Sequence, residues 1–171
     1  MAGAIFKRIP HVCADSAKLI ERMNYIRNPL ATDECMIYGS FVSLRYPYEE
    51  MMMVKRCYLS PYNNTLLGNH FFEYVVSLPE EESDRVQDFV LCVQEINRFL
   101  ATYSGSHFQT ISAVHTNTDN LHAHIICNNI DWMTGMRFNP PPYQRIAIKE
   151  GVSALLIRYG FSNVMFIAEA A

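Results

Sequence analysis

The chain has 171 residues, a length that suits one domain built around a single hydrophobic core. Half of its residues are hydrophobic and 18% are charged, as is typical of globular proteins, and no apolar run is long enough to predict membrane insertion. The N-terminal segment lacks the long apolar core of a secretory signal. The net charge of −3 counts against a nucleic-acid partner, because phosphate binding usually requires a basic surface, although a narrow cleft can still be locally positive.

Cysteine usage points to a reducing compartment. The five cysteines lie far apart, are odd in number and form no CxxC pair, so neither a disulfide framework nor a thiolate zinc site is indicated. They are Cys13, Cys35, Cys57, Cys92 and Cys127. We expect most of them to pack as small apolar residues in a cytoplasmic protein.

The first half of the chain is predicted to alternate strands and helices. In chain order, the pattern predicts a strand at 4–9, a helix at 15–27, a short strand at 36–42, a helix at 48–58 and a loop at 61–68. Asp15 or Ser16 is the expected N-cap of the first helix. The pair Asn28-Pro29 ends it, because the residue before a proline disfavours the helical conformation.

The second half adds most of the sheet. The predicted elements are a strand at 70–78, a helix at 83–103, strands at 108–115 and 122–131, a helix at 143–159 and a terminal strand at 163–168. The polar loop 116–120 between two apolar runs predicts a hairpin, and Gly160 lies where a C-cap glycine is expected. The whole order predicts an α+β fold, with an antiparallel-rich sheet of about five strands and helices packed on its faces.

Three histidines lie on the predicted hairpin. In an extended strand, residues two apart share a face, so His122 and His124 project side by side, and Ile126 and Asn128 continue their row. His115 ends the preceding strand and returns across the hairpin to the same place. Three imidazoles that converge in this way predict a metal site with open positions for solvent or substrate.

The competing interpretation is three incidental histidines on an exposed strand. The chain has only six histidines, and three of them fall within ten residues, which favours the metal site. Imidazole suits Zn, Mn, Fe, Ni or Cu, so the ligand type alone does not choose the ion.

With this histidine pattern, the sequence resembles the relaxases of mobilisable plasmids and conjugative transposons, which belong to the His-hydrophobe-His endonuclease group. The signature HxxxxxxHxH followed by an asparagine matches His115, His122, His124 and Asn128. Four further segments match the family: Tyr25-Ile-Arg-Asn-Pro29, Tyr48-Glu-Glu-Met51, Phe72 to Pro79 and Asp131 to Phe138. The resemblance covers roughly residues 20–160 and implies the palm-type relaxase fold.

The resemblance implies a catalytic cycle. Tyr25 would attack a phosphodiester, leaving a 5′-phosphotyrosyl bond and a free 3′-hydroxyl, and the same site could later religate the strand. A phenol with a pKa near 10 is a poor nucleophile at neutral pH and needs a base or nearby positive charge. A divalent ion held by the three histidines would polarise the phosphate, with Mn or Mg the expected ion and Zn or Ni further candidates.

Other residues receive supporting roles by the same resemblance. Glu73 lies on the central strand, where it would orient a ligand histidine and accept or relay the tyrosine proton; the alternative is a carboxylate that faces solvent. Asn128 would support the ligands from the second shell. The candidates for phosphate contacts are Arg27, Lys55, Arg56 and Arg137, each of which could equally be solvated surface.

Several residues are assigned no chemistry. Asp119 is interpreted as a turn residue of the hairpin rather than a ligand. His11 and His70 lack partners at ligand spacing and are interpreted as structural. Tyr46, Tyr48 and Phe138 could stack on unpaired bases, but the sequence does not place them.

Three alternatives stay open. A Tyr-x-x-x-Tyr pair, Tyr58 and Tyr62, would mark replication-initiator or transposase relatives, but it precedes the histidines and Ser60-Pro61 would break its helix. A rolling-circle replication initiator would use a tyrosine after the histidines, Tyr143 or Tyr159. The third alternative is a non-nuclease, either a histidine metalloenzyme for small substrates or a metal-containing DNA-binding module.

The leading hypothesis also sets the surroundings of the protein. The expected partner is single-stranded or hairpin DNA at a transfer origin, with an accessory DNA-binding protein and a conjugative secretion apparatus as further partners. The chain would act in the bacterial cytoplasm. We expect residues 1–171 to form the relaxase catalytic domain, as the N-terminal part of a longer protein.

Overall fold

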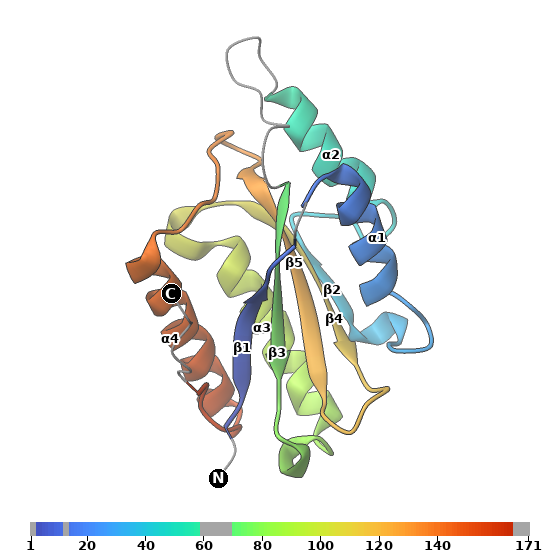
Figure 1. Ribbon diagram of the computed structural model, residues 1–171, viewed down its shortest axis with the longest axis vertical. Coiled ribbons are helices and arrows are strands. Elements are labelled where there is room, and N and C mark those ends of the chain that lie inside the picture. Colours follow the sequence, from blue (N-terminus) through green and yellow to red (C-terminus); the bar gives the residue numbers. More distant parts are fainter. Residues whose placement is uncertain (1–2, 12–13, 59–69, 166–171) are drawn as a thin grey trace.

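A computed structural model describes residues 3–11, 14–58 and 70–165 (Figure 1). Its core is a five-stranded sheet in the order β1-β3-β5-β4-β2, in which every neighbouring pair is antiparallel. The strands are β1 (Ile5–Ile9), β2 (Ile37–Ser40), β3 (Phe71–Ser77), β4 (Phe108–His115) and β5 (His122–Asp131). The helices are α1 (Ser16–Ile26), α2 (Pro47–Cys57), α3 (Val86–Ala101) and α4 (Pro142–Arg158). The predicted α+β class is confirmed.

The helices cover the two faces of the sheet in pairs (Figure 1). On one face, α3 and α4 pack on a core that includes Phe72, Ile125 and Leu156. On the other face, α1 and α2 pack on a smaller core that includes Met23, Met51 and Ile126. The three inner strands β3, β5 and β4 are therefore buried on both faces along almost their whole length.

Local chemistry sets the bounds of α1. The Asp15 side chain accepts a hydrogen bond from the Lys18 amide at 2.8 Å and caps the first turn, as predicted. After Ile26 the chain turns at Asn28, whose side chain accepts the amide of Leu30 at 3.0 Å and whose carbonyl accepts the amide of Ala31. The helix thus presents its last turn, which carries Tyr25, beside the sheet.

The structure differs from prediction at several places. The predicted helix at 83–103 begins only at Val86, because Glu80–Glu82 form a separate 3-10 turn. The predicted strand at 163–168 is reduced, within its described part, to one bridge between Val164 and Ala4. Residues 166–168 and the predicted loop at 61–68 lie outside the described residues.

The described cysteines divide between core and surface. Cys92 and Cys127 are buried as expected, whereas Cys35 and Cys57 are exposed. Cys13 lies outside the described part of the chain.

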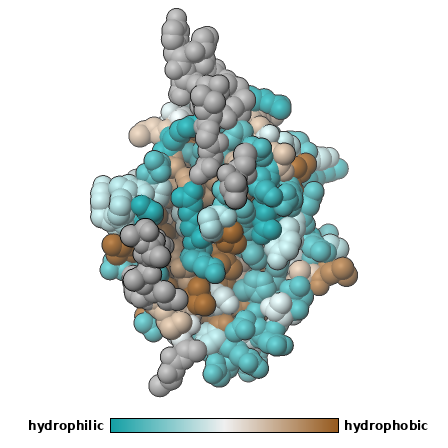
Figure 2. Space-filling view, in the orientation of Figure 1, coloured by the Kyte–Doolittle hydropathy of each residue, from teal (hydrophilic) through white to brown (hydrophobic). Residues whose placement is uncertain are grey.

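The surface matches the moderate composition of the chain. Figure 2 shows hydrophilic residues over most of the visible face, with scattered hydrophobic patches. Within the described residues, no helix is both long enough and apolar enough to cross a bilayer.

Candidate active site

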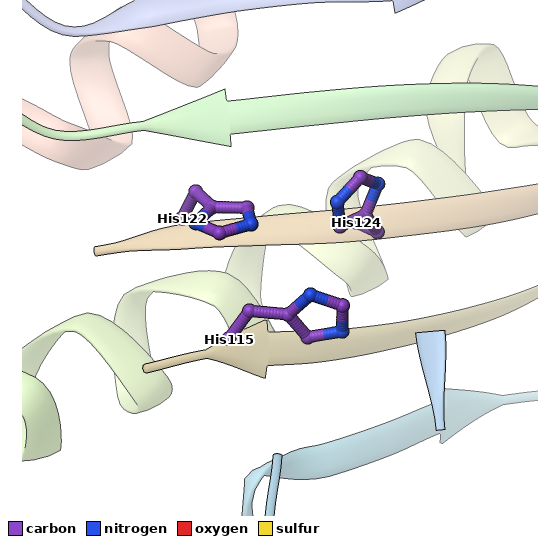
Figure 3. Close-up of side chains that lie close together, drawn as sticks. All are labelled: His115, His122 and His124. Atoms are coloured by element: carbon purple, nitrogen blue, oxygen red, sulfur yellow. The ribbon is translucent and has the colours of Figure 1, made fainter. Parts of the chain in front are cut away.

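His115, His122 and His124 converge on the α1 side of the sheet, at the hairpin end of β4 and β5 (Figure 3). His115 is paired with His122 across the two strands, and His124 follows two positions later on the same face. One ring nitrogen from each side chain lies within 4.8 Å of the others, close enough for all three to hold one ion. The donor set of three imidazoles fits a divalent metal and leaves further coordination positions open.

Each imidazole is oriented by an oxygen on its outer nitrogen. His115 Nε2 donates to the carbonyl of Ile26 at 2.8 Å, and His122 Nδ1 donates to the carbonyl of Asn120 at 3.0 Å. His124 Nδ1 bonds Glu73 Oε1 at 2.9 Å. A carbonyl or carboxylate oxygen can only accept, so these nitrogens carry the protons and the opposite nitrogens keep lone pairs for a metal.

Electrostatics favours neutral ligands at two of the three positions. Burial lowers the pKa of His115, and the charges of His124 and His122 lower it further. The hydrogen bond to Ile26 raises this pKa but does not outweigh the burial. Burial likewise lowers the pKa of His122, opposed by its bond to Asn120. A lowered pKa keeps the imidazole in the neutral form that binds metals.

Glu73 lies at the centre of a buried ion network behind the triad. Its carboxylate is 0% exposed and receives donors from three other residues. Oε1 accepts from His124 and from Arg22 Nη2 at 2.8 Å, while Oε2 accepts from Arg22 Nε at 2.9 Å and from His11 Nε2 at 2.7 Å. Burial alone would raise the pKa of Glu73, but the bonds from His124 and Arg22 outweigh it and lower the pKa to about 2.

This network separates the two roles expected for Glu73. Its bond to His124 fits the predicted orienting role. The proton-acceptor role fits poorly, because four donors already occupy the two oxygens and a carboxylate with so low a pKa is a weak base. The alternative of a solvent-facing carboxylate is wrong, since Glu73 is fully buried.

Tyr25 lies beside the triad. Its ring centroid is 5.7 Å from that of His115 and 5.4 Å from that of His124, and its side chain is 46% exposed. The guanidinium of Arg22, one helical turn earlier on α1, lies 4.1 Å from the centre of the Tyr25 ring. The phenol is therefore open to solvent on one side, while its ring contacts two candidate metal ligands and a cation.

The sequence analysis missed two members of this site. His11 was interpreted as structural, yet it bonds the carboxylate that orients His124. Arg22 was assigned no role, yet it contacts both Glu73 and Tyr25. The only available hint for Arg22 was its spacing of three residues before Tyr25 on a predicted helix, which places the two side chains on one face.

Asn128 lies in a different network from the histidines. It accepts a hydrogen bond from Lys55 Nζ and donates to Gln109 Oε1 at 3.0 Å and to the carbonyl of Met51 at 3.3 Å. On β5 it follows His124 by four positions, which corresponds to about 13 Å in an extended strand. The structure therefore gives Asn128 a packing role under α2 in place of the predicted second-shell role.

The four predicted phosphate contacts lie in different surroundings. Lys55 is 0% exposed and bonds Asn128 and Asn129 Oδ1, so its ammonium is not on the surface as a phosphate contact requires. Arg27 is the C-cap residue of α1 and donates to the carbonyl of Leu44 at 2.8 Å. Arg56 is exposed on α2. Arg137 lines a cavity of about 250 Å³ that Arg8 also lines, at the far end of the sheet.

The competing tyrosines lie elsewhere. Tyr58 donates to the carbonyl of Trp132 at 2.9 Å, beyond the far end of β5. Tyr143 lies in the first turn of α4, on the opposite face of the sheet. Tyr159 is the C-cap of this helix and donates to Glu95 at 2.7 Å. Tyr62 lies outside the described residues. Among those of these tyrosines that the structure describes, Tyr25 is the one whose ring contacts the triad.

The sequence from residue 25 to residue 161 matches the family model of the relaxase MobA/VirD2-like nuclease domain. The chain belongs to this relaxase family. The match begins at Tyr25 and includes all three histidines. It confirms the predicted family and the predicted enzyme class, a DNA-nicking relaxase with a role in mobilisation.

Solved structures of other relaxases share the fold. One is the MobM relaxase domain (MOBV; Mob_Pre) bound to plasmid pMV158 oriT DNA with Mn, which has a TM-score of 0.69 and 12% identity over 99% of this chain and 94% of that chain. A second MobM complex, with 23-nucleotide oriT DNA, has a TM-score of 0.66 and 12% identity over 99% and 92%. A comparison with curated proteins found no match. At such low identity the likeness establishes the relaxase fold, and the site has to be argued from this chain's own residues.

Proposed function

We propose that this relaxase cuts one strand of transfer-origin DNA by attack of the Tyr25 phenol and keeps the cut end covalently bound. The observation that carries the proposal is the position of Tyr25, half exposed and in ring contact with His115 and His124. A scissile phosphate placed over the triad would lie within reach of the phenol.

The proposed step balances without a redox change. The Tyr25 hydroxyl loses its proton to solvent, its oxygen forms a bond to phosphorus, and the bond from phosphorus to the 3′ oxygen breaks. The leaving oxygen takes up a proton and becomes a 3′-hydroxyl, while the 5′ phosphate remains on the tyrosine. Because one phosphodiester replaces another, the reverse attack by a 3′-hydroxyl reseals the strand.

The chain's own residues prepare the nucleophile. The Arg22 guanidinium packs over the Tyr25 ring, and its fork on Glu73 fixes the position of that cation. Glu73 in turn fixes the plane of the His124 ring. Arg27, two residues after Tyr25, would contact a neighbouring phosphate.

His115, His122 and His124 would hold the divalent ion, through His115 Nδ1 and the Nε2 atoms of the other two. When bound, the ion supplies Lewis-acid stabilisation of charge on the phosphate oxygens. We propose Mn or Mg as the working ion, and the related MobM structures contain Mn.

The wider setting is also proposed. The DNA partner is single-stranded or hairpin origin DNA, as the MobM complexes with oriT DNA suggest. An accessory DNA-binding protein and a conjugative secretion apparatus would act with it in the bacterial cytoplasm. Residues 1–171 would form the catalytic domain at the N-terminus of a longer relaxase.

The test is a nicking assay with trapping of the adduct. Labelled single-stranded oligonucleotides that tile the DNA flanking the chain's own coding sequence are incubated with the protein and Mn. We expect a covalent adduct that withstands denaturation and is lost on addition of chelator. Tyr25→Phe should abolish it, whereas the matched variant Tyr143→Phe should leave it unchanged.

The same assay separates the alternatives. Mass spectrometry of the trapped peptide identifies the modified tyrosine directly. An adduct on Tyr143 or Tyr159 would favour a rolling-circle initiator and overturn the assignment of Tyr25. Binding without an adduct on any oligonucleotide would favour a DNA-binding module.

A further inference from the structure

We propose that a surface leading away from Tyr25 binds the unpaired strand on one side of the nick, by stacking bases on aromatic rings. This aromatic track consists of Phe41, Leu44, Arg45, Tyr46, His107 and Trp132. The proposal rests on the proposed function, since it assigns a path to the DNA that the nicking site acts on.

The far end of the track is a cluster of three rings. Phe41 lies 5.7 Å from His107 and 6.2 Å from Trp132, centroid to centroid, and His107 lies 6.4 Å from Trp132. Phe41 is 43% exposed and Trp132 is 42% exposed. Three rings in mutual contact that leave their outer faces in water form a platform for another flat apolar group.

The platform is rigid because Asp131 holds the turn under it. Asp131 Oδ1 accepts the amides of Met133 and Thr134 at 2.8 and 3.1 Å, and Oδ2 accepts the amide of His107 at 2.9 Å. The Trp132 amide donates to the carbonyl of His107 at 3.1 Å. The backbone that carries the His107 and Trp132 rings is thus fixed before any ligand arrives, which reduces the entropy lost on binding.

Phe41 combines an exposed ring with an unusual backbone conformation. Its φ of 56° lies in the left-handed region, which is uncommon for a side chain of this size. The strain is not offset by burial in the core, because the ring remains half exposed. Strain of this kind is concentrated at binding and catalytic sites, where the surrounding structure keeps a side chain ready for a ligand.

The segment between the platform and the nucleophile is anchored at both sides. Arg27 Nη2 donates to the carbonyl of Leu44 at 2.8 Å, and Arg27 follows Tyr25 by two residues. The Ser43 amide donates to Glu50 on α2 at 2.9 Å. The track therefore runs from the C-terminal end of α1, whose last turn carries Tyr25, to the platform.

Its chemistry fits an unpaired nucleic acid strand. Arg45 lies over the ring of Tyr46, which is 53% exposed, at 5.3 Å, so the segment pairs a cation with an exposed ring. Cations neutralise phosphates and exposed rings stack on bases, whereas the bases of a duplex are already stacked within it. The chain has a net charge of −3, which disfavours DNA binding overall. The pairing of Arg45 with the Tyr46 ring gives DNA a local binding site.

Trp132 is the only tryptophan of the chain, so its fluorescence reports on the platform. The protein is titrated with dT12 in chelator, which prevents nicking, and binding is measured both by Trp132 emission and by anisotropy of a labelled dT12. We expect saturable quenching that weakens with added salt. A 12-base-pair duplex should quench far less at the same concentration.

Variants then test the individual rings. Phe41→Ala should weaken dT12 binding by about fivefold or more, and Phe41→Tyr should restore it, because base stacking on one ring contributes about that much. The matched control is Tyr143→Ala, which removes an exposed aromatic side chain from α4 on the opposite face. Unfolding temperatures of all variants show whether a loss of binding follows from a loss of folding.

The outcomes distinguish this proposal from the proposed function. Saturable dT12 binding that quenches Trp132 supports the track even if no adduct ever forms on Tyr25. Adduct formation together with unchanged dT12 affinity in a folded Phe41→Ala protein overturns the track and leaves the nicking site standing. Equal weakening by Tyr143→Ala also overturns it.

Discussion

Arg22 is the residue on which the arrangement of the site depends most. Its guanidinium makes two hydrogen bonds to Glu73 and lies over the Tyr25 ring, so one side chain joins the nucleophile to the residue that orients His124. The hydrogen bond to Glu73 raises the pKa of Arg22, which keeps its charge fixed. A lysine could supply the charge but not the planar fork.

We predict that Arg22→Met lowers the rate of single-turnover nicking by about 10- to 100-fold, the usual effect of losing a residue behind a metal ligand. Arg22→Lys should recover only part of the rate. Lys18→Met is the matched control, because Lys18 lies one turn earlier on α1 and forms a surface ion pair with Glu21. An Arg22→Met enzyme with normal rates would show that the fork is dispensable.

A second prediction at the residue scale concerns Lys55 and pH. Burial lowers the pKa of Lys55 to about 7, with the charge of Arg137 acting in the same direction, whereas the unfolded chain has an ordinary lysine pKa of about 10.4. Between these two values the unfolded state binds a proton that the folded state does not. The free energy of unfolding should therefore rise with pH in this window, and the cost of the buried charge is fully present below about pH 7.

Chemical denaturation of wild type and Lys55→Met at pH 7.5 and 8.5 measures this term. We expect the free energy of unfolding of the wild type to rise by about 1 kcal/mol relative to the variant between pH 7.5 and 8.5, because the unfolded state binds about one more proton than the folded state. Arg56→Met, an exposed neighbour on α2, should show no such change relative to wild type. If the difference in free energy of unfolding between wild type and Lys55→Met did not change with pH, burial would not lower the pKa of Lys55.

At the scale of elements, α1 contributes the nucleophile and the sheet contributes the ligands. Strand alternation predicted the face shared by His122 and His124, and hairpin geometry predicted the approach of His115, because both depend on neighbours along the chain. The contacts of His11 and Arg22 with Glu73 join residues 62 and 51 positions apart, which no local spacing encodes. Alternation also placed Asn128 in the row of the histidines, but it could not show that α2 brings Lys55 onto it.

The N-cap of α1 offers a test that separates stability from catalysis. Asp15→Ala removes the acceptor of the Lys18 amide and should lower the free energy of unfolding by about 1 kcal/mol. Tyr25 lies in the last turn of the same helix, held by the sheet, so the nicking rate of the folded protein should not change. Asp15→Ser should keep most of the stability. A large loss of rate in a folded Asp15→Ala protein would contradict this division.

At the scale of the whole molecule, the candidate metal centre connects two strands to a helix from the other layer. Ligands on β4 and β5 are held in place by oxygens of Ile26, Asn120 and Glu73, so the fold itself orients all three imidazoles. A ligand that binds only the folded state stabilises it according to its concentration relative to Kd. Metal should therefore raise the unfolding temperature of the entire domain.

With Mn at about a hundred times its Kd, we predict a rise in Tm of about 5 to 10 °C for a chain of this size. His122→Ala should remove most of this shift. Asp119→Ala, in the exposed loop of the same hairpin, serves as the control and should retain it. Equal shifts in all three proteins would place the ion somewhere other than the triad.

The hydrogen bond from His115 to the Ile26 carbonyl has a consequence for the safety of the DNA. Ile26 directly follows Tyr25, so the ring that would face the ion also fixes the backbone that carries the phenol. A molecule in which this ring is displaced should therefore lose the metal centre and the alignment of the phenol together. We expect such a molecule to leave DNA strands intact. Strand breaks would then be made only by molecules whose site can also reseal them.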